Sequence, residues 1–257
     1  MAIGERLESP PLVEALCEFR FVPSGTWDWT IPGRLYDLIS EDFPDRAQVE
    51  EVAMQLEPGD VLTHRVVKGP GRVQLKRSDG SAMVQVGPNL LVINQLKPYT
   101  GWPDFLARIL DVYETYKKLA SSLDIARIGL RYINQIPLSE EMTDLSLLIS
   151  VDPPLTGRLQ RPLLGFYQRY ELSNEEPEGV LIHQSGLQKN EDSDFILIDL
   201  DFNSQTVEGV AASSDLREWL EKAHNCIEES FIDSLNPDLY ENLKQREHGN
   251  NSSQETK

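Results

Sequence analysis

The first side chains to test for catalytic or metal-binding chemistry are the four histidines. They lie in separate stretches of the chain, at His64, His183, His224 and His248. Neither a His-x-x-x-His nor a Cys-x-x-Cys spacing occurs, so no structural zinc site is predicted. Glu221 and His224 have the spacing of one half of a di-iron carboxylate motif, but the second Glu-x-x-His that such a site needs is absent from the sequence. His224 is therefore interpreted as a surface or partly buried helix residue.

Asp199 and Asp201 form the strongest carboxylate pair, in the run Ile-Leu-Ile-Asp-Leu-Asp-Phe. Two residues apart on a strand, they point to the same side, where paired carboxylates can hold a divalent cation or share a proton. Alternatively, they form the solvent face of a strand whose other face is core. No Gly-x-Ser-x-Gly motif and no glycine-rich phosphate loop accompanies them. The sequence thus predicts a protein that is not an enzyme, with no metal and no cofactor.

Basic side chains gather between residues 61 and 80 of an otherwise acidic chain. A Gly-Pro-Gly turn predicts a hairpin across this segment, with basic residues at Arg65, Lys68, Arg72 and Lys76. Arg72 and Lys76 alternate with apolar residues, so they are expected to project together from the solvent face. Such a surface can contact a nucleic-acid backbone or an acidic protein. Alternatively, its charges protect a sheet edge against aggregation.

Two arginines occupy matching positions in similar local sequences. Arg20 in Phe-Arg-Phe and Arg131 in Leu-Arg-Tyr lie 111 residues apart, and the same interval separates Asp104 from Asp215, each of which opens a long amphipathic stretch. A repeated interval of this kind indicates an internal duplication. Arg20 and Arg131 are then candidate binding residues at equivalent points of one surface. Glu14 and Glu18, on the same strand face, can instead simply pair with Arg20.

The first half of the chain is predicted to contain two helices and six strands. Alternation over residues 12–22 predicts a half-buried strand, and the apolar spacing predicts helices at 28–40 and 103–121. Five strand-like runs separated by turn residues lie between the helices, at 49–57, 61–68, 71–77, 82–87 and 90–96. Short strands with tight turns are typical of an antiparallel meander.

The second half is predicted to repeat this order. A strand at 127–136 precedes a helix near 140–150, and a long helix at 213–235 ends before Asn236-Pro237. Three strands lie between the two helices, at 164–173, 179–188 and 194–203.

These elements predict an α+β protein of two similar halves, residues 1–124 and 125–243, followed by a disordered tail at 244–257. In each half, one long helix is expected to cover one face of an antiparallel sheet. The order of elements is similar to that of the TATA-binding-protein-like fold and, less closely, to helix-grip folds. Similarity of element order implies architecture alone and no function.

The composition is typical of a water-soluble globular protein. The 257 residues are 40% hydrophobic and 26% charged. The chain contains neither an apolar run of about 18 residues nor the apolar region of a signal peptide, so we expect no membrane contact and a cytoplasmic location. Cys17 and Cys226 fit the pattern of reduced, buried thiols.

The net charge of −18 is unevenly distributed. Residues 1–137 carry 18 acidic and 15 basic side chains, a net charge of −3, whereas residues 138–257 carry 24 and 9, a net charge of −15. The anionic half repels nucleic-acid phosphates and membrane surfaces and can attract a basic protein. The simpler alternative is that the charge serves solubility.

Several short motifs resemble, in the same order, those of a sporadically distributed prokaryotic family of uncharacterised proteins of similar length. They are Pro10-Pro-Leu-Val-Glu-Ala-Leu-Cys-Glu-Phe-Arg-Phe21, Tyr99-Thr-Gly-Trp102 with Phe105, Arg127-Ile-Gly-Leu-Arg-Tyr-Ile-Asn134, Ile198-Asp-Leu-Asp201, and His224 with Phe231. The resemblance implies a bacterial or archaeal origin and a patchy occurrence that suggests mobile or defence-associated gene neighbourhoods. It implies no catalytic residues, so none is carried over.

The sequence favours a regulatory or adaptor subunit whose acidic second half docks a basic protein partner. The alternative is nucleic-acid or nucleotide binding through the basic 61–80 hairpin, which the net charge disfavours. A third hypothesis is metal-dependent hydrolysis by Asp199 and Asp201. The sequence leaves the oligomeric state open.

Overall fold

A computed structural model gives the structure of the protein at residues 10–23, 25–49, 52–57, 63–68, 71–120, 124–138, 165–189, 194–204 and 216–245. At 52–57 and 63–68 it describes the backbone alone. Both helices and strands occur, which confirms the predicted mixture of the two.

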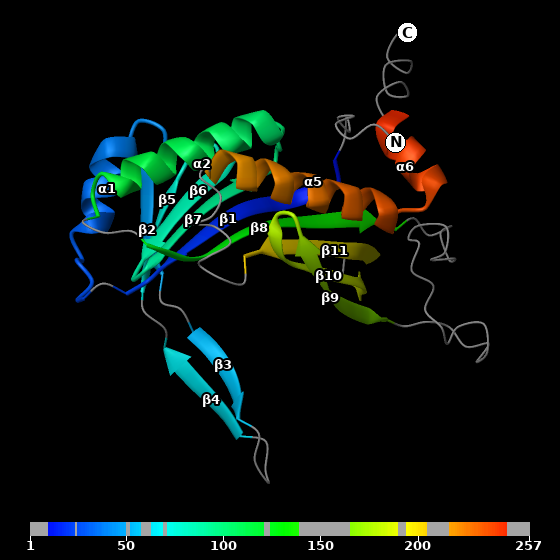
Figure 1. Cartoon of the computed structure of the whole chain (residues 1–257), viewed down its shortest axis with the longest axis horizontal. Helices are drawn as coiled ribbons and strands as arrows, with labels where there is room; N and C mark the ends of the chain where they lie inside the picture. The colour runs from blue at the N-terminus through cyan, green and yellow to red at the C-terminus, as the bar shows by residue number, and fades with distance from the viewer. Residues whose placement is uncertain are drawn as a thin grey trace, which may run out of the picture. The chain divides into compact units, whose positions relative to one another are not determined.

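Most strands belong to one antiparallel sheet, with the hydrogen-bonded order β2-β5-β6-β7-β1-β8-β11-β10-β9 (Figure 1). Its nine strands are, in chain order, β1 (Leu12–Phe21), β2 (Asp45–Val49), β5 (Arg72–Lys76), β6 (Ala82–Gly87), β7 (Leu90–Leu96), β8 (Ile125–Pro137), β9 (Tyr167–Glu175), β10 (Glu178–Lys189) and β11 (Asp194–Asn203). β3 (Val52–Glu57) and β4 (Thr63–Lys68) pair only with each other among the described strands. The helices of the described residues are α1 (Ile31–Ile39), α2 (Trp102–Lys117), α5 (Leu216–Ser234) and α6 (Pro237–Gln245).

The chain divides into two compact units, named here after their long helices. The α2 unit contains Leu16–Ile128, and the α5 unit contains the chain up to Ala15, Gly129–Gln205 and the chain from Ala212 onward. Strands β1 and β8 each contribute residues to both units. The predicted boundary after residue 124 lies immediately before β8.

In the α2 unit, β1 presents alternate residues to the helices. Cys17, Phe19 and Phe21 are buried, as the alternation predicts. Phe19 stacks on Tyr113 and Phe21 on Tyr116, with ring centroids 4.8 and 5.4 Å apart. The predicted apolar stripe of α2 is buried in full, at Phe105, Ile109, Val112, Tyr113 and Tyr116.

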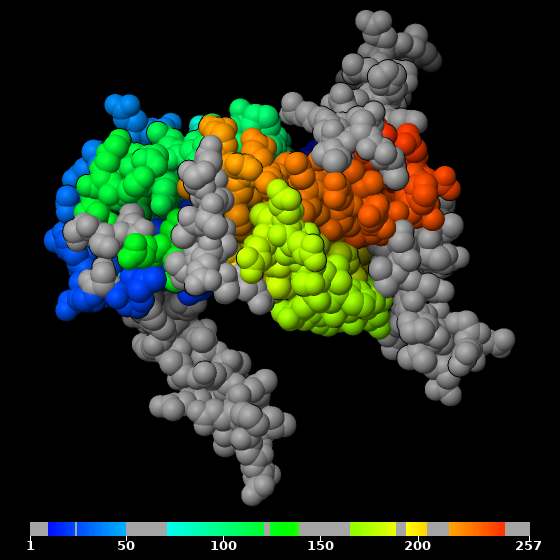
Figure 2. Space-filling model, viewed as in Figure 1, coloured from blue at the N-terminus to red at the C-terminus, as the bar shows by residue number. Residues whose placement is uncertain are grey.

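In the α5 unit, α5 packs against β11. Leu200 and Phe202 are fully buried, and the Phe202 ring lies 5.7 Å from that of Trp219 on α5. The tyrosine ring of Tyr132 on β8 lies 5.6 Å from the imidazole of His224, also on α5. The helix therefore covers the strand face predicted to be core, and much of its outer side, in orange, lies at the surface (Figure 2).

Some predicted elements differ from the structure. The segment 45–49 is a strand that was not predicted, and α6 begins at Pro237, where only a helix stop was expected. The Asn236 side chain accepts a hydrogen bond from the backbone N–H of Asp238, so the same dipeptide that ends α5 also caps α6. Because α6 includes Lys244, the predicted tail begins too early; residues beyond 245 and the predicted helix near 140–150 lie outside the described residues.

Candidate functional site

The polar sheet face of the α5 unit is organised around an ion pair between Arg131 on β8 and Asp199 on β11. Arg131 donates from Nε to Oδ1 at 2.7 Å and from Nη2 to Oδ2 at 2.5 Å. The register places Asp201, not Asp199, directly opposite Arg131, so the guanidinium reaches diagonally along one face. The side chain of Asp199 is 6% exposed and that of Arg131 is 38% exposed. The pair is therefore a two-point, charge-assisted contact whose anion is buried and whose cation reaches solvent.

Residues of β9 and β10 extend this ion pair into a network. Gln184 donates from Nε2 to Asp199 Oδ2 at 3.1 Å. Gln184 Oε1 accepts hydrogen bonds from Arg169 Nη1 at 3.1 Å and from the Tyr167 hydroxyl. Arg169 in turn pairs with Glu171 at 2.8 Å. Polar side chains of four neighbouring strands are thus hydrogen-bonded to one another, and the sequence did not predict this.

Asp199 and Asp201 share a face, as predicted, but both interact with Arg131. The hydrogen bond that Arg131 donates to Asp199 is the largest cause of the raised pKa of Arg131, and the charge of Asp201 raises that pKa further. Within the described parts of the chain, His, Cys, Asp and Glu side chains form no cluster of three or more that could hold a metal ion. The two carboxylates therefore hold a guanidinium in place.

Arg20 and Arg131 have different partners despite their matching positions. Arg20 donates from Nε and Nη2 to Glu18, at 2.7 and 3.1 Å, as the predicted pairing requires. Glu18 also accepts a hydrogen bond from Arg127 at 2.8 Å. Because the Arg20 side chain is 51% exposed, its pairing contributes less than about 1 kcal/mol to stability.

The prediction that residues 61–80 form one basic hairpin is wrong. Arg65 and Lys68 lie on β4, which pairs with β3, whereas Arg72 and Lys76 lie on β5, which pairs with β2 and β6. The side chains of Arg65 and Lys68 lie outside the described residues. Lys76 is exposed and lies opposite Asp45 of β2. β4 and β5 therefore belong to different sheets and do not form one hairpin.

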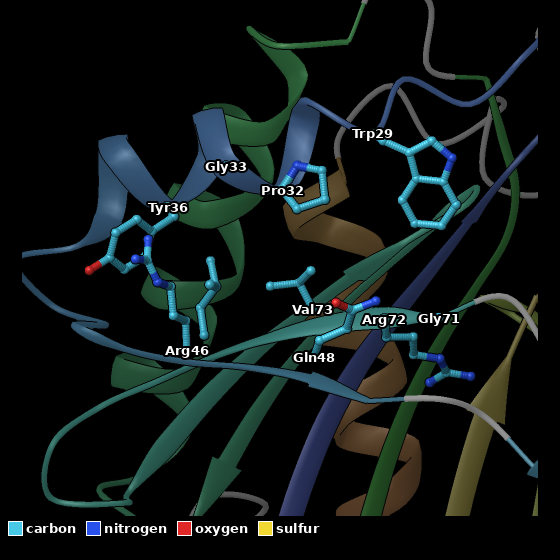
Figure 3. Close-up of a pocket in the computed structure, with 10 residues that line it drawn as sticks. Trp29, Pro32, Gly33, Tyr36, Arg46, Gln48, Gly71, Arg72 and Val73 are labelled. Carbon is cyan, nitrogen blue, oxygen red and sulfur yellow. The ribbon is translucent and has the colours of Figure 1, made fainter.

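Arg72 instead lines a pocket of the α2 unit between α1 and strands β2 and β5 (Figure 3). Apolar residues of the lining are Pro32, Val73 and Leu75, and the polar ones are Arg46, Gln48 and Arg72. Two aromatic residues, Trp29 and Tyr36, complete it, and Trp29 is 61% exposed. The Arg46 guanidinium lies 4.7 Å from the centroid of the Tyr36 ring, a cation–π distance. The pocket therefore combines flat aromatic surface with positive charge.

The sequence also did not predict a buried contact between a serine and a histidine in the α5 unit. His183 Nε2 lies 2.7 Å from Ser234 Oγ, and Ser234 Oγ donates to the backbone carbonyl of Ser230 at 2.5 Å. Because the hydroxyl has a single proton, His183 must be the donor to Ser234. Burial lowers the pKa of His183. The imidazole is thus a neutral donor that fixes the end of α5, and it does not act as a base toward Ser234. The alternation of β10 places His183 on the core face, but no sequence signal pairs it with Ser234.

The outer side of α5 is acidic toward its C-terminal end. Glu228, Glu229 and Asp233 lie there, and no basic residue occurs in the last turn of the helix. Among the described residues no cation pairs with these three carboxylates. Lys222, on the same helix, instead bridges Glu218 and Glu176 at 3.0 and 2.6 Å. Burial, and secondarily repulsion by Glu229, raises the pKa of Glu228. Negative charge at the negative end of a helix dipole is unfavourable, so this surface favours a cationic neighbour.

No protein-family model matches the chain, and no curated protein matches it with significant similarity. In the part of the chain that the structure covers, none of the helices is both long and apolar enough to span a bilayer.

Proposed function

We propose that the protein is a non-catalytic regulatory or adaptor subunit that binds a basic protein partner through its acidic second half. The observation that carries this proposal is the group Glu228, Glu229 and Asp233 on the outer side of α5, defined here as the acidic end of α5, with which no cation of the described residues pairs. We expect a cytoplasmic protein, and the motif resemblance supports a role beside prokaryotic defence or stress-response genes.

A cationic partner would relieve two unfavourable terms at the acidic end of α5. The first is the repulsion between Glu228 and Glu229: burial raises the pKa of Glu228, and the charge of Glu229 raises it further. The second is their position at the negative end of the helix dipole. Relief of both on binding favours a basic partner over a neutral one, and complementary charge also increases the rate of encounter.

The proposed architecture of two similar halves is supported by the strand order. Read from β2, the order is β2-β5-β6-β7-β1; read from the other end, it is β9-β10-β11-β8. In both readings, a run of neighbouring antiparallel strands ends at the strand that comes first in that half of the chain, β1 or β8. In both halves, the long helix follows in sequence the strand next to it, β7 or β11. A TATA-binding-protein-like or helix-grip-like duplication has this pattern, and a doubled scaffold suits a protein that connects partners.

The test is affinity capture from native lysate with the full chain as bait. A triple variant, Glu228→Gln, Glu229→Gln and Asp233→Asn, is compared with a control that neutralises exposed acidic residues of α2, Asp111→Asn and Glu114→Gln. We expect a basic protein that is retained by the parent and the control, is lost with the triple variant and is released at high salt, where the screening length falls to about 3 Å at 1 M. Equal loss with both variants, or salt-insensitive capture, contradicts the proposal.

A second candidate function, binding of a nucleotide or a nucleic-acid group, is favoured by the pocket of Figure 3. Trp29 offers a stacking surface for a base, and Arg72 and Arg46, which lies over the Tyr36 ring, offer charge for a phosphate. Titration with ATP and with a single-stranded oligonucleotide, followed by tryptophan fluorescence, tests this function. We expect the response to weaken with Arg46→Gln and with Arg72→Gln, both of which leave Trp29 in place as the reporter. A response unchanged in both variants excludes this pocket.

A further inference from the structure

Strand β9 has an unusual surface for the end of a sheet. It is the last strand in the hydrogen-bonded order and pairs only with β10 among the described strands. Seven of its nine residues are exposed, including Tyr167, Tyr170 and Leu172, which are 64%, 46% and 51% exposed. A long edge strand with exposed apolar side chains is a template for another strand unless it is covered.

The hydrogen bonds to β10 determine which backbone groups of β9 point outward. Leu187 N–H donates to the carbonyl of Phe166 at 3.1 Å, and the register places these two residues directly opposite each other. Directly bonded pairs alternate along an antiparallel ladder. The even-numbered residues 168–174 therefore bond to β10, and the odd-numbered residues 167–175 direct their N–H and C=O groups to the outer edge.

We propose that β9 pairs with β9 of a second copy of this chain, antiparallel about a two-fold axis at Tyr170. In this register, the outward-bonding residue Arg169 lies opposite the partner's Glu171, and Tyr167 lies opposite the partner's Ser173. The charges of Arg169 and Glu171, which already pair within one chain at 2.8 Å, then form an alternating square of four. Each copy supplies the same surface, as a two-fold interface requires.

The opposite face of the paired strands carries Tyr170 and Leu172, flanked by Gln168 and Asn174. Tyr170 meets its own copy in a non-hydrogen-bonded pair, where side chains are closest, and Leu172 lies diagonally beside it. Tyr170 and Leu172 of the two copies thus lie together across the axis, with the His183 ring 6.2 Å from that of Tyr170 in each copy.

Charge and hydrogen bonding together select this register. If one strand slides by one residue, outward-bonding residues of one copy lie opposite inward-bonding residues of the other, and the backbone groups cannot pair. A slide of two residues in one direction sets Glu171 against its own copy, and in the other direction Arg169 against its own copy. A slide of four residues, which centres Leu172, also pairs opposite charges, Arg169 with Glu175, but it leaves the outward backbone groups of Tyr167 without a partner.

The solution mass of the full chain, measured by sedimentation velocity, tests the pairing. We expect a particle of twice 29.1 kDa for the parent. Arg169→Glu and Glu171→Arg should each give the monomer, since each creates a like-charge pair twice, and the double variant should restore the dimer. Glu175→Arg, the matched control, should remain dimeric, because Glu175 lies opposite Gly165 in this register. A monomeric parent, or single variants that stay dimeric, overturns the proposal.

A cysteine at the axis tests the register itself. Two residues that meet in a non-hydrogen-bonded antiparallel pair have Cα atoms about 4.5 Å apart, within reach of a disulfide. Tyr170→Cys should therefore form a covalent dimer under mild oxidation, whereas Leu172→Cys should not. Cys17 and Cys226 are present in both variants and in the parent, so the parent reports their background. Cross-linking of Leu172→Cys with none of Tyr170→Cys overturns the proposed axis.

Discussion

Arg131 and Asp199 are 68 residues apart in sequence and are joined by two hydrogen bonds of 2.7 and 2.5 Å. Arg20, in the matching position of the first half, bonds instead to Glu18 in its own strand. The two arginines at matching positions therefore differ in their partners: Arg131 bonds to a residue distant in sequence, and Arg20 bonds to a residue of its own strand.

This difference predicts unequal effects of the same substitution. Arg131→Leu leaves the nearly buried carboxylate of Asp199 without its cation, and we expect a loss of about 2–3 kcal/mol, below the range for fully buried pairs because Arg131 is 38% exposed. Arg20→Leu should cost less than about 1 kcal/mol. Urea denaturation of both variants measures the contrast. The double variant Arg131→Leu, Asp199→Leu should recover much of the loss, and equal losses at Arg20 and Arg131 would contradict the assignment.

Stability should fall in mild acid because of His224. Burial lowers the pKa of His224 from 6.5 to about 4, so below pH 6.5 the unfolded chain binds a proton that the folded chain does not. The resulting loss grows as pH falls from about 6.5 to about 4 and amounts to about 1 kcal/mol between pH 7.5 and 5.5. His183, whose pKa burial also lowers, acts in the same direction. Denaturation of the parent and of His224→Gln at both pH values isolates the effect; a parallel decline in the two proteins would exclude His224 as its source.

Two glycines should respond oppositely to alanine. A Cβ at Gly179 would lie 2.6 Å from the carbonyl oxygen of Asn203 and 2.9 Å from the Phe202 ring, whereas a Cβ at Gly33 would meet nothing within 4 Å. Gly179→Ala should therefore cost about 1–3 kcal/mol through overpacking. Gly33→Ala, inside α1, should stabilise by about 0.5–1 kcal/mol. Thermal unfolding of both variants checks the pair, and a neutral Gly179→Ala would mean that β10 and β11 are further apart.

Charge reversal at the two ends of α5 should also have opposite signs. Asp233→Lys replaces an exposed carboxylate in the last turn, at the negative end of the helix dipole, and should stabilise the protein by about 0.3–1 kcal/mol. Glu218→Lys, in the first turn, removes a favourable charge and the 3.0 Å contact with Lys222, so it should destabilise by a similar amount. Denaturation at low and high salt measures both. Effects that persist unchanged at high salt would not be electrostatic.

Local sequence patterns predicted the helices and strands better than they predicted which strands pair with each other. The period-two alternation of β1 and the apolar stripe of α2 were confirmed because each depends only on which face of one element is buried. The apolar spacing at 28–40 predicted a helix, but not every apolar residue of α1 is buried: Ile31, Leu35 and Ile39 are, whereas Leu38 is 58% exposed. The segment 45–49 escaped prediction because all five of its residues are exposed and carry no alternation.

The candidate sites were less predictable than the elements. The sequence predicted that Asp199 and Asp201 share one face of β11. It did not predict that Arg131 pairs with Asp199, because the register of β8 against β11 is a property of the assembled sheet. The network through Gln184 and Arg169, the His183–Ser234 contact and the pocket around Arg72 likewise join residues far apart in the chain.

The sequence by itself determined the α+β class, the face of most elements that becomes buried and the concentration of negative charge in the second half. These depend on composition and on neighbours a few residues away, where backbone geometry sets the period. The tertiary structure alone decided which strands pair, that β4 and β5 enter different sheets, and that Arg131 meets Asp199 while Arg20 remains with Glu18. Strand pairing is decided by the packing of whole sheet faces, and a turn sequence between two strands does not specify it.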